Sequence, residues 1–272
     1  MIKSAVVTVH EFLTCGTMPD HIWYIQKCGL CEQLTAEELG RLESQARIRT
    51  FPKNAPIYLP RDPANLVYIL AEGRVRLVSL TPEGKQAILA MFEPGDLFGE
   101  LSLVGSETRE EFAEAMVKST VVAIPRDTME EVMLSNPRLT LAVTKLIGFR
   151  RRKLERRLRN LLFRTNRERL IALLWELVEQ YGKSTPEGTL INIRLSHQDL
   201  ASLIGITRES VTLTLGELQS EGLVSIGRQR ILIHQLDRLA SAANESLNEL
   251  PTDLQPSTQI QSSSRGASPV RD

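Results

Sequence analysis

Arg208 and Glu209 form an adjacent pair of side chains that could recognise nucleic-acid bases. They lie within SHQDLASLIGITRESVTLTLGEL, residues 196–218. An arginine can donate two hydrogen bonds to O6 and N7 of guanine, and a glutamate can accept one from N4 of cytosine. Because the pair follows Thr207, it would occupy the first turn of a helix that this threonine caps. The pair therefore predicts contact with an adjacent G and C on opposite strands of duplex DNA.

Two short amphipathic helices joined by a tight turn must position this pair. Ser196 is a suitable N-cap for the first helix, and Gly205 permits the turn that follows. The apolar residues that share one face are Leu200, Leu203 and Ile204 in the first helix, and Val211, Leu215 and Leu218 in the second. This pattern is typical of a helix-turn-helix, whose second helix enters the major groove. In and beside the first turn of this helix, the residues predicted to bind DNA are Thr207, Arg208, Glu209, Ser210 and Thr212.

A hairpin-like segment and a basic charge block accompany this motif. LVSIGRQRILIHQ follows the second helix as a predicted wing, with Arg228 and Arg230 as candidate phosphate contacts. Residues 145–234 carry 16 Lys and Arg against 9 Asp and Glu, although the whole chain has a net charge of zero. The block is consistent with a polyanionic partner or with a solvated surface. A winged helix that binds another protein remains the alternative, and it would show no salt-dependent affinity for DNA.

Residues 49–125 are expected to form an antiparallel β-barrel or jelly roll. Between residues 49 and 125, short apolar segments alternate with turns that contain Gly and Pro, which is typical of such folds. The segments are IYL, LVYIL, RVRLVSL, QAILAMF and TVVAI. Residues 18–48 are expected to be helical, with Thr35 and Glu38 spaced as a capping box.

A long helix is predicted from Asn136 to about residue 165. Pro137 suits its first turn, and apolar residues recur at spacings of three and four. They are Leu139, Val143, Leu146, Ile147, Leu154, Leu158 and Leu161. A second copy of the chain is the simplest cover for so long a seam, whereas the chain's own barrel could cover only part of it. FRTN, residues 163–166, is the predicted hinge to the last domain.

The C-terminal region is expected to form an α+β unit around the two short helices. RERLIALLWELVEQYG, residues 167–182, predicts an amphipathic helix that ends at Gly182. KSTPEGT is expected to be a polar loop and INIRL a short strand. The last 32 residues are rich in Ser, Gln, Pro and Asn, and we expect them to be disordered.

Composition and residue placement exclude several classes of protein. No apolar run reaches the roughly 18 residues that cross a bilayer, and the N-terminus is a poor signal peptide. Three cysteines, all before residue 32, cannot form a disulfide framework, so we expect a cytoplasmic protein. Metal-dependent oxygenases need clustered histidines and carboxylates, but no histidine lies between residues 49 and 125. We therefore predict no metal site and no enzymatic activity.

Residues 22–235 resemble the catabolite activator/fumarate-nitrate reduction (CRP/FNR) regulator family. EPGDLFGELSLV is similar to the family's effector-pocket turn, NPRLTLAVTKLIGFRRRKLERRLRNLLF to its dimerisation helix, and LSHQDLASLIGITRESVTLTL to its helix-turn-helix. The resemblance implies a homodimer that binds palindromic DNA and contacts RNA polymerase. Arg208 and Glu209 match the pair that reads a GTGA-type half-site, and His197 and Gln198 match positions that touch phosphates. A third reader, often arginine, falls on Leu213.

The predicted fold class is therefore α+β, with a cyclic-nucleotide-binding-like β jelly roll, a long dimerisation helix and a winged helix-turn-helix. The expected divisions are an N-terminal extension (1–21), the sensor barrel (22–135), the dimerisation helix and hinge (136–165), the DNA-binding domain (166–240) and the tail (241–272). An effector in the barrel, or simply the protein's abundance, would bias the long helix and thereby the spacing of the two recognition helices.

The resemblance also outlines an effector pocket that departs from the cyclic-AMP pattern. Its candidate residues are Gly99, Glu100, Leu101, Ser102, Arg109, Leu154 and Glu155. In relatives that bind cyclic AMP, a Ser follows the arginine and two hydroxyl residues on the helix touch adenine. Here Glu110 follows Arg109, and Leu154 and Glu155 replace the hydroxyl pair. A carboxylate beside a phosphate repels it, so the sequence disfavours a cyclic nucleotide. Without any ligand, Glu100 could simply belong to a retained barrel turn.

Cys15, Cys28 and Cys31 provide the alternative sensor. They resemble the N-terminal cluster of the iron–sulfur branch of the family, and a redox-sensing regulator would use them. That branch has four cysteine ligands and this chain has three. Because free cysteine is also among the most buried residue types, we predict core cysteines and no iron–sulfur cluster.

Overall fold

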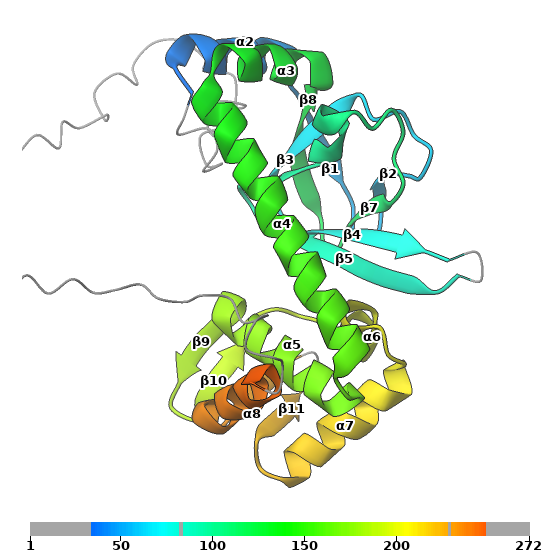
Figure 1. Ribbon diagram of the computed structural model, residues 1–272, viewed down its shortest axis with the longest axis vertical. Coiled ribbons are helices and arrows are strands. Elements are labelled where there is room, and N and C mark those ends of the chain that lie inside the picture. The colour runs from blue at the N-terminus through cyan, green and yellow to red at the C-terminus, as the bar shows by residue number, and fades with distance from the viewer. Residues whose placement is uncertain (1–33, 82–83, 228–229, 249–272) are drawn as a thin grey trace, which may run out of the picture. The chain divides into compact units, whose positions relative to one another are not determined.

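The computed structural model describes residues 34–81, 84–227 and 230–248 (Figure 1). Its contacts divide the chain into two compact units, with the boundary between Leu158 and Arg159, and each unit is described by itself. Cys15, Cys28, Cys31 and Arg228 lie outside the described residues. Among the helices of the described ranges, none is long and apolar enough to cross a membrane.

Two antiparallel four-stranded sheets form the first unit (Figure 1). The strands are β1 (Arg47–Phe51), β2 (Pro56–Tyr58), β3 (Leu66–Glu72), β4 (Val75–Leu80), β5 (Gln86–Phe92), β6 (Leu97–Phe98), β7 (Phe112–Ala115) and β8 (Ser119–Pro125). One sheet has the order β1-β8-β3-β6 and the other β2-β7-β4-β5. All five predicted strand segments are confirmed. Between the sheets, Phe98 is completely buried and stacks on Tyr68 and Phe92 with ring centroids 5.1 Å apart.

Helices α2 (Ala36–Gln45) and α3 (Arg126–Ser135) lie against each other beside the first sheet. The Thr35 hydroxyl accepts a hydrogen bond from the Glu38 amide, and the Glu38 carboxylate accepts one from the Thr35 amide, which confirms the predicted capping box. The helix ends earlier than predicted. Residues 47–48 belong to β1, because RIRTF pairs along its whole length with β8 and satisfies its backbone there.

Helix α4 (Pro137–Phe163) confirms the predicted long helix. The Asn136 side chain caps it by accepting hydrogen bonds from the amides of Arg138 (3.0 Å) and Leu139 (3.1 Å). The predicted apolar seam is divided between two environments. Leu139 and Val143 are buried in the core of the barrel, whereas Leu154 and Leu158 are 47% and 56% exposed. The chain's own barrel therefore covers only the N-terminal part of the seam.

The second unit contains, in its described part, a four-stranded sheet with the order β11-β12-β10-β9 and four helices besides the end of α4. These elements are α5 (Asn166–Tyr181), β9 (Gly182–Thr185), β10 (Gly188–Ile191), α6 (His197–Ile204), α7 (Arg208–Ser220), β11 (Val224–Gly227), β12 (Arg230–Ile233) and α8 (Leu236–Asn248). The fully buried leucines at their centre include Leu170, Leu174, Leu177, Leu200, Leu215 and Leu218.

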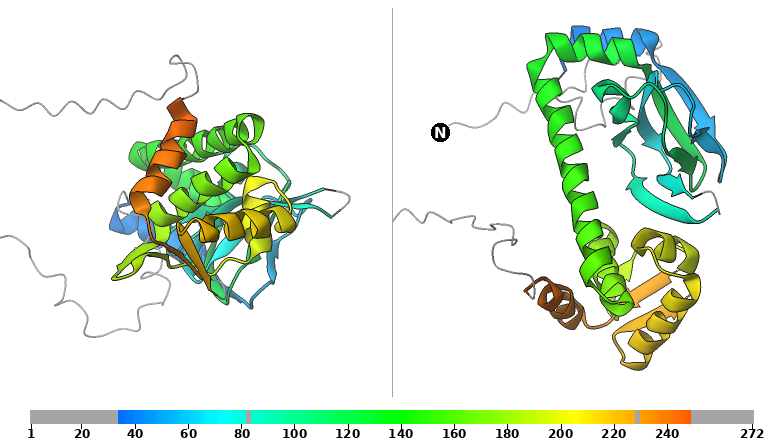
Figure 2. Two further views of the ribbon diagram at one scale, coloured as in Figure 1. Left: turned by 90° about the horizontal axis from the view of Figure 1, so that it is seen from below. Right: turned by 45° about the vertical axis from the view of Figure 1, so that its right-hand side comes forward.

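Three predictions for this unit are wrong. KSTPEGT is not a loop: Lys183–Thr185 and Gly188–Ile191 pair as a hairpin, and only Ile191 of INIRL is in a strand. Residues 241–248 are not disordered, because they belong to α8, which packs on α5 (Figure 2). Leu239 and Ala243 bury one face of α8, and this contact holds the segment in place. The prediction for 249–272 lies outside the described residues.

The corner between α4 and α5 is held by hydrogen bonds. The guanidinium of Arg169 donates to the carbonyls of Leu161 (2.6 Å) and Arg164 (2.9 Å), which α4 itself leaves without partners. Thr165 caps α5 in a second capping box with Glu168. Arg164 is buried and donates to the carbonyl of Ala243 in α8 (3.3 Å). Residues 163–166, the predicted hinge, thus lie in a turn that several side-chain hydrogen bonds stabilise.

Candidate DNA-binding surface

Helices α6 and α7 form the predicted helix-turn-helix. Ser196 caps α6 in a capping box with Asp199, and the Thr207 hydroxyl caps α7 by accepting from the Ser210 amide (3.2 Å). Between them Gly205 has φ +68°, a left-handed conformation that favours glycine. A Cβ at this position would lie 2.9 Å from the Leu161 side chain. The tight turn therefore depends on glycine for its conformation, and a larger residue would also displace the end of the Leu161 side chain.

Arg208 and Glu209 lie in the first turn of α7 and are exposed. Within the described residues, no hydrogen bond or ion pair holds either side chain. Val211, Leu215 and Leu218 are buried on the side of the same helix that lies opposite Glu209. The fold thus presents a guanidinium and a carboxylate that are both free to bind an external partner, as the sequence predicts.

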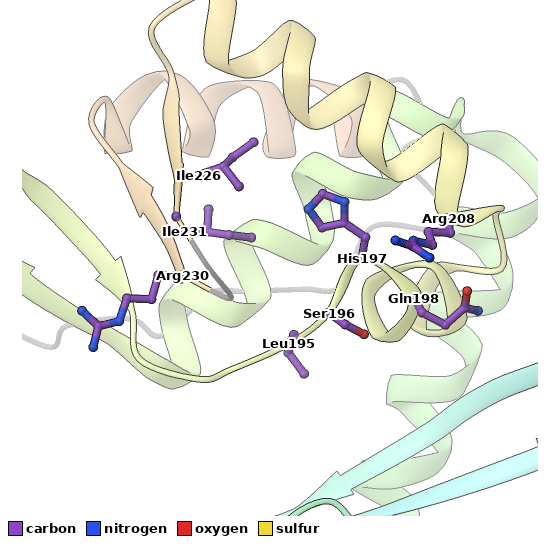
Figure 3. Close-up of a pocket in the computed structure, with 9 residues that line it drawn as sticks. Leu195, Ser196, His197, Gln198, Arg208, Ile226, Arg230 and Ile231 are labelled. Atoms are coloured by element: carbon purple, nitrogen blue, oxygen red, sulfur yellow. The ribbon is translucent and has the colours of Figure 1, made fainter.

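A surface cavity of about 600 Å³ adjoins this helix end (Figure 3). Its lining comes from the start of α6, the start of α7 and the wing strands, namely Leu195, Ser196, His197, Gln198, Arg208, Ile226, Gly227, Arg230 and Ile231. His197 and Arg208 lie near each other in Figure 3, with Arg230 across the cavity on β12. The structure therefore brings the predicted residues His197, Gln198 and Arg208 together with Arg230.

Other predicted DNA contacts are also engaged inside the domain. The Thr212 hydroxyl donates to the Arg208 carbonyl (2.9 Å) and lies 2.8 Å from Nδ1 of His197, which ties α7 to α6. The hydroxyls of Thr207 and Ser210 lie 3.0 Å apart at the helix cap. These residues shape the surface, whereas the side chains of Arg208 and Glu209 have no such internal role among the described residues.

The predicted effector-pocket residues lie in the first unit, around a short 3-10 helix, η2 (Glu100–Val104). Glu100 is buried and pairs with Arg150 of α4 at 2.6 Å. Arg150 also donates to the Leu97 carbonyl, and its guanidinium lies 4.9 Å above the centre of the Phe92 ring. Sequence reasoning missed Arg150, because nothing distinguishes it from its neighbours in the basic run RRRK. The carboxylate of Glu100 is thus already paired with a guanidinium of the same chain, that of Arg150.

Arg109 is also engaged within the chain through both of its terminal nitrogens, whereas its buried Nε has no hydrogen-bond partner among the described residues. Its guanidinium donates to the carbonyls of Gly99 (3.0 Å) and Leu66, and it stacks 4.4 Å from the centre of the Tyr58 ring. Gly99 has φ +76°, and a Cβ there would lie 3.0 Å from Arg109. Burial raises the pKa of the nearby Glu111 carboxyl, and the charges of Glu110 and Glu100 raise it further. Carboxyl groups therefore lie close to Arg109, the residue at which the resemblance to the family would place an anionic ligand.

The remaining predicted pocket residues have different surroundings. Ser102 is buried and donates to the Gly99 carbonyl (2.9 Å), whereas Leu101 is exposed. Leu154 is half exposed on α4, and Glu155 pairs with Arg151 at 2.7 Å. The structure therefore brings Gly99, Glu100, Ser102 and Arg109 together and leaves Leu154 and Glu155 on the exposed side of α4.

Fold and surface together define a class of protein, a DNA-binding transcription regulator with an N-terminal β-domain and a C-terminal winged helix-turn-helix. Residues 48–136 match the cyclic nucleotide-binding domain, and residues 168–242 match the Crp-like helix-turn-helix domain. The chain belongs to the CRP/FNR family of transcription regulators.

Similar proteins include regulators of several kinds. The chain is 31% identical to the global nitrogen regulator of Synechocystis sp., over 69% of this chain and 84% of that protein. It is also 31% identical to the anaerobic regulatory protein of Bacillus subtilis, over 73% of this chain and 84% of that protein. A solved CRP-family transcription regulator from Thermus thermophilus is 28% identical with a TM-score of 0.61, over 72% of this chain and 96% of that chain. These relatives are transcription regulators and not enzymes.

Proposed function

We propose that this regulator acts as a homodimer on palindromic DNA with GTGA-like half-sites. The observation that carries the proposal is the exposed pair Arg208 and Glu209, without partners among the described residues, beside a cavity lined by further cationic and polar groups. Two symmetric recognition helices would bind two half-sites about one helical turn apart. By family membership, RNA polymerase is the expected protein partner, and the cytoplasm is where the dimer would act.

The exposed part of the α4 seam supports the dimer. Leu154 and Leu158 are 47% and 56% exposed, although they lie on a helix whose N-terminal apolar residues Leu139 and Val143 are buried. Apolar side chains repeated at helical spacing are stabilised when a second helix covers them. A symmetric pair of α4 helices would bury these residues in both copies.

DNA binding is expected to weaken steeply with salt. If five phosphates are neutralised, affinity for a duplex should fall about 500-fold between roughly 50 and 200 mM salt, because bound cations are released on association. Fluorescence anisotropy with a labelled duplex, selected from random sequences, measures this slope. An affinity that is unchanged over this range would contradict DNA binding and favour the protein-interaction alternative.

We further propose that the barrel responds to an effector other than a cyclic nucleotide, or that control lies in protein abundance. The two terminal nitrogens of Arg109 already donate to backbone carbonyls, Glu100 pairs with Arg150, and Glu111 adds a carboxyl group nearby. A phosphate would have to displace these contacts and would come close to carboxyl groups, whose negative charge repels it.

Cyclic AMP and cyclic GMP are expected to leave the melting temperature unchanged. A ligand present at about 100 times its Kd would raise it by about 5–10 °C in a protein of this size, because it binds only the folded state. A thermal-shift titration to millimolar nucleotide tests this, with a duplex that contains the selected site as the positive control. A saturable rise with either nucleotide would overturn the assignment.

A further inference from the structure

Leu213 is the large apolar side chain on the outward face of α7. An α-helix has about 3.6 residues per turn, so Glu209, Leu213 and Gly216 fall on one line along it. Val211, Leu215 and Leu218 are completely buried on the opposite side, whereas Leu213 is 67% exposed. The side chain is therefore presented directly beyond the base-reading pair and away from the domain's own core.

Gly216 stands on the same line, in the interior of the 13-residue helix α7. Glycine in a helix interior costs about 0.5–1 kcal/mol relative to alanine. A Cβ at this position would meet no atom within 4 Å, so packing inside the domain does not require the glycine. Because glycine has no side chain, it would let the surface of a binding partner approach the helix backbone closely at this position. The outward face of α7 thus carries the apolar side chain of Leu213 and, at Gly216, a position where no side chain covers the backbone.

We propose that Leu213 is a specificity-determining residue that contacts the C5-methyl group of a thymine. Leucine has no hydrogen-bonding group, and in the major groove the thymine methyl is the apolar feature that distinguishes one base from the others. The thymine would lie next to the base pairs read by Arg208 and Glu209, and Gly216 would let α7 enter the groove deeply enough. The inference rests on the proposed DNA binding and assigns Leu213 to one of the T·A pairs that a GTGA-like half-site contains.

Thr212 is poorly placed for the same contact. Its hydroxyl is held by the Arg208 carbonyl and lies 2.8 Å from His197, which fixes the side chain toward α6. Leu213 has no such constraint and projects from the exposed face. The two adjacent residues therefore have separate roles, one in holding the two helices together and one in contacting DNA.

Replacement of thymine by deoxyuridine tests the proposal without changing the protein. The half-site is first selected from random duplexes with the wild-type chain, and a T·A pair is expected beside the G·C step. Each thymine of the half-site is then replaced singly by deoxyuridine, which removes the methyl group and keeps every hydrogen-bonding group. Wild-type affinity is expected to fall about fourfold at one of these positions, the effect of exposing one buried methyl group.

Leu213→Ala should bind the thymine and deoxyuridine duplexes equally, because alanine is too short to reach the methyl group. Gln219→Ala, at another exposed position of α7, is the matched control and should keep the fourfold difference. Selection without thymine in the half-site, equal wild-type binding to both duplexes, or an unchanged difference in Leu213→Ala would each overturn the inference. Failure of the wild type to bind any duplex would instead overturn the proposed function itself.

Discussion

The double variant Leu154→Glu/Leu158→Glu is expected to be a monomer with at least about 100-fold weaker affinity for the palindromic site. Both side chains lie on the exposed half of α4, four residues apart and therefore on the same face. In a symmetric pair of helices, each new carboxylate would face the equivalent carboxylate of the second copy, and the two would repel each other. The interface would also lose the apolar surface of both leucines. Each recognition helix would then bind its half-site without the advantage of being tethered to the other.

Light scattering coupled to gel filtration measures the oligomeric state, and anisotropy with full-site and half-site duplexes measures the affinity. Arg152→Gln/Arg156→Gln provides the control, because these exposed residues lie on a different face of α4 with the same spacing. The control should remain dimeric. A Leu154→Glu/Leu158→Glu protein that is still dimeric would place the interface elsewhere on the molecule.

Arg208→Ala is expected to cost about 1–3 kcal/mol in binding and to remove the preference for guanine at one position of each half-site. The guanidinium has no partner among the described residues, so its loss should leave the folded domain intact. Binding is measured to the selected site and to sites in which that guanine is replaced by each other base. Wild type should discriminate among the four duplexes, and the variant should bind all four with similar affinity.

Arg230→Ala separates base reading from attraction to phosphates. Arg230 lies at the start of β12, on the wing side of the cavity, and is exposed. Loss of a phosphate contact should weaken binding to every sequence alike and reduce the salt slope by about one unit. If Arg208→Ala behaves in this way and keeps its guanine preference, the base-reading assignment is wrong.

Local patterns in the sequence were sufficient to predict most elements. The strands of the barrel alternate with Gly and Pro turns, and the N-caps at Thr35, Ser196 and Thr207 lie where hydroxyl residues precede apolar runs. Arg208 and Glu209 could be placed for the same reason, because the cap and the buried positions of α7 fix which face is exposed. Periodicity and capping act over a few residues, so they are visible in a single chain.

The features that were missed depend on contacts between distant residues. The strand Gly182–Thr185 has little apolar alternation, and its pairing with β10 is a matter of backbone hydrogen bonds. Among the residues of α8 whose burial is described, Leu239 and Ala243 are buried, and their contact with the rest of the domain was not evident from composition. The pair of Glu100 with Arg150 joins residues that are far apart in the chain. Charge runs alone do not reveal which arginine turns inward.

The ion pair between Glu100 and Arg150 raises the apparent Kd of any small molecule that would bind to the Glu100 carboxylate. Such a molecule binds only the fraction of protein in which Arg150 has moved away, and its apparent Kd equals the intrinsic Kd divided by that fraction. If about one molecule in a hundred were open, the apparent affinity would fall about 100-fold, or about 2.7 kcal/mol. The barrel would then ignore weak or scarce metabolites and respond only to one that binds tightly enough to outcompete the chain's own arginine.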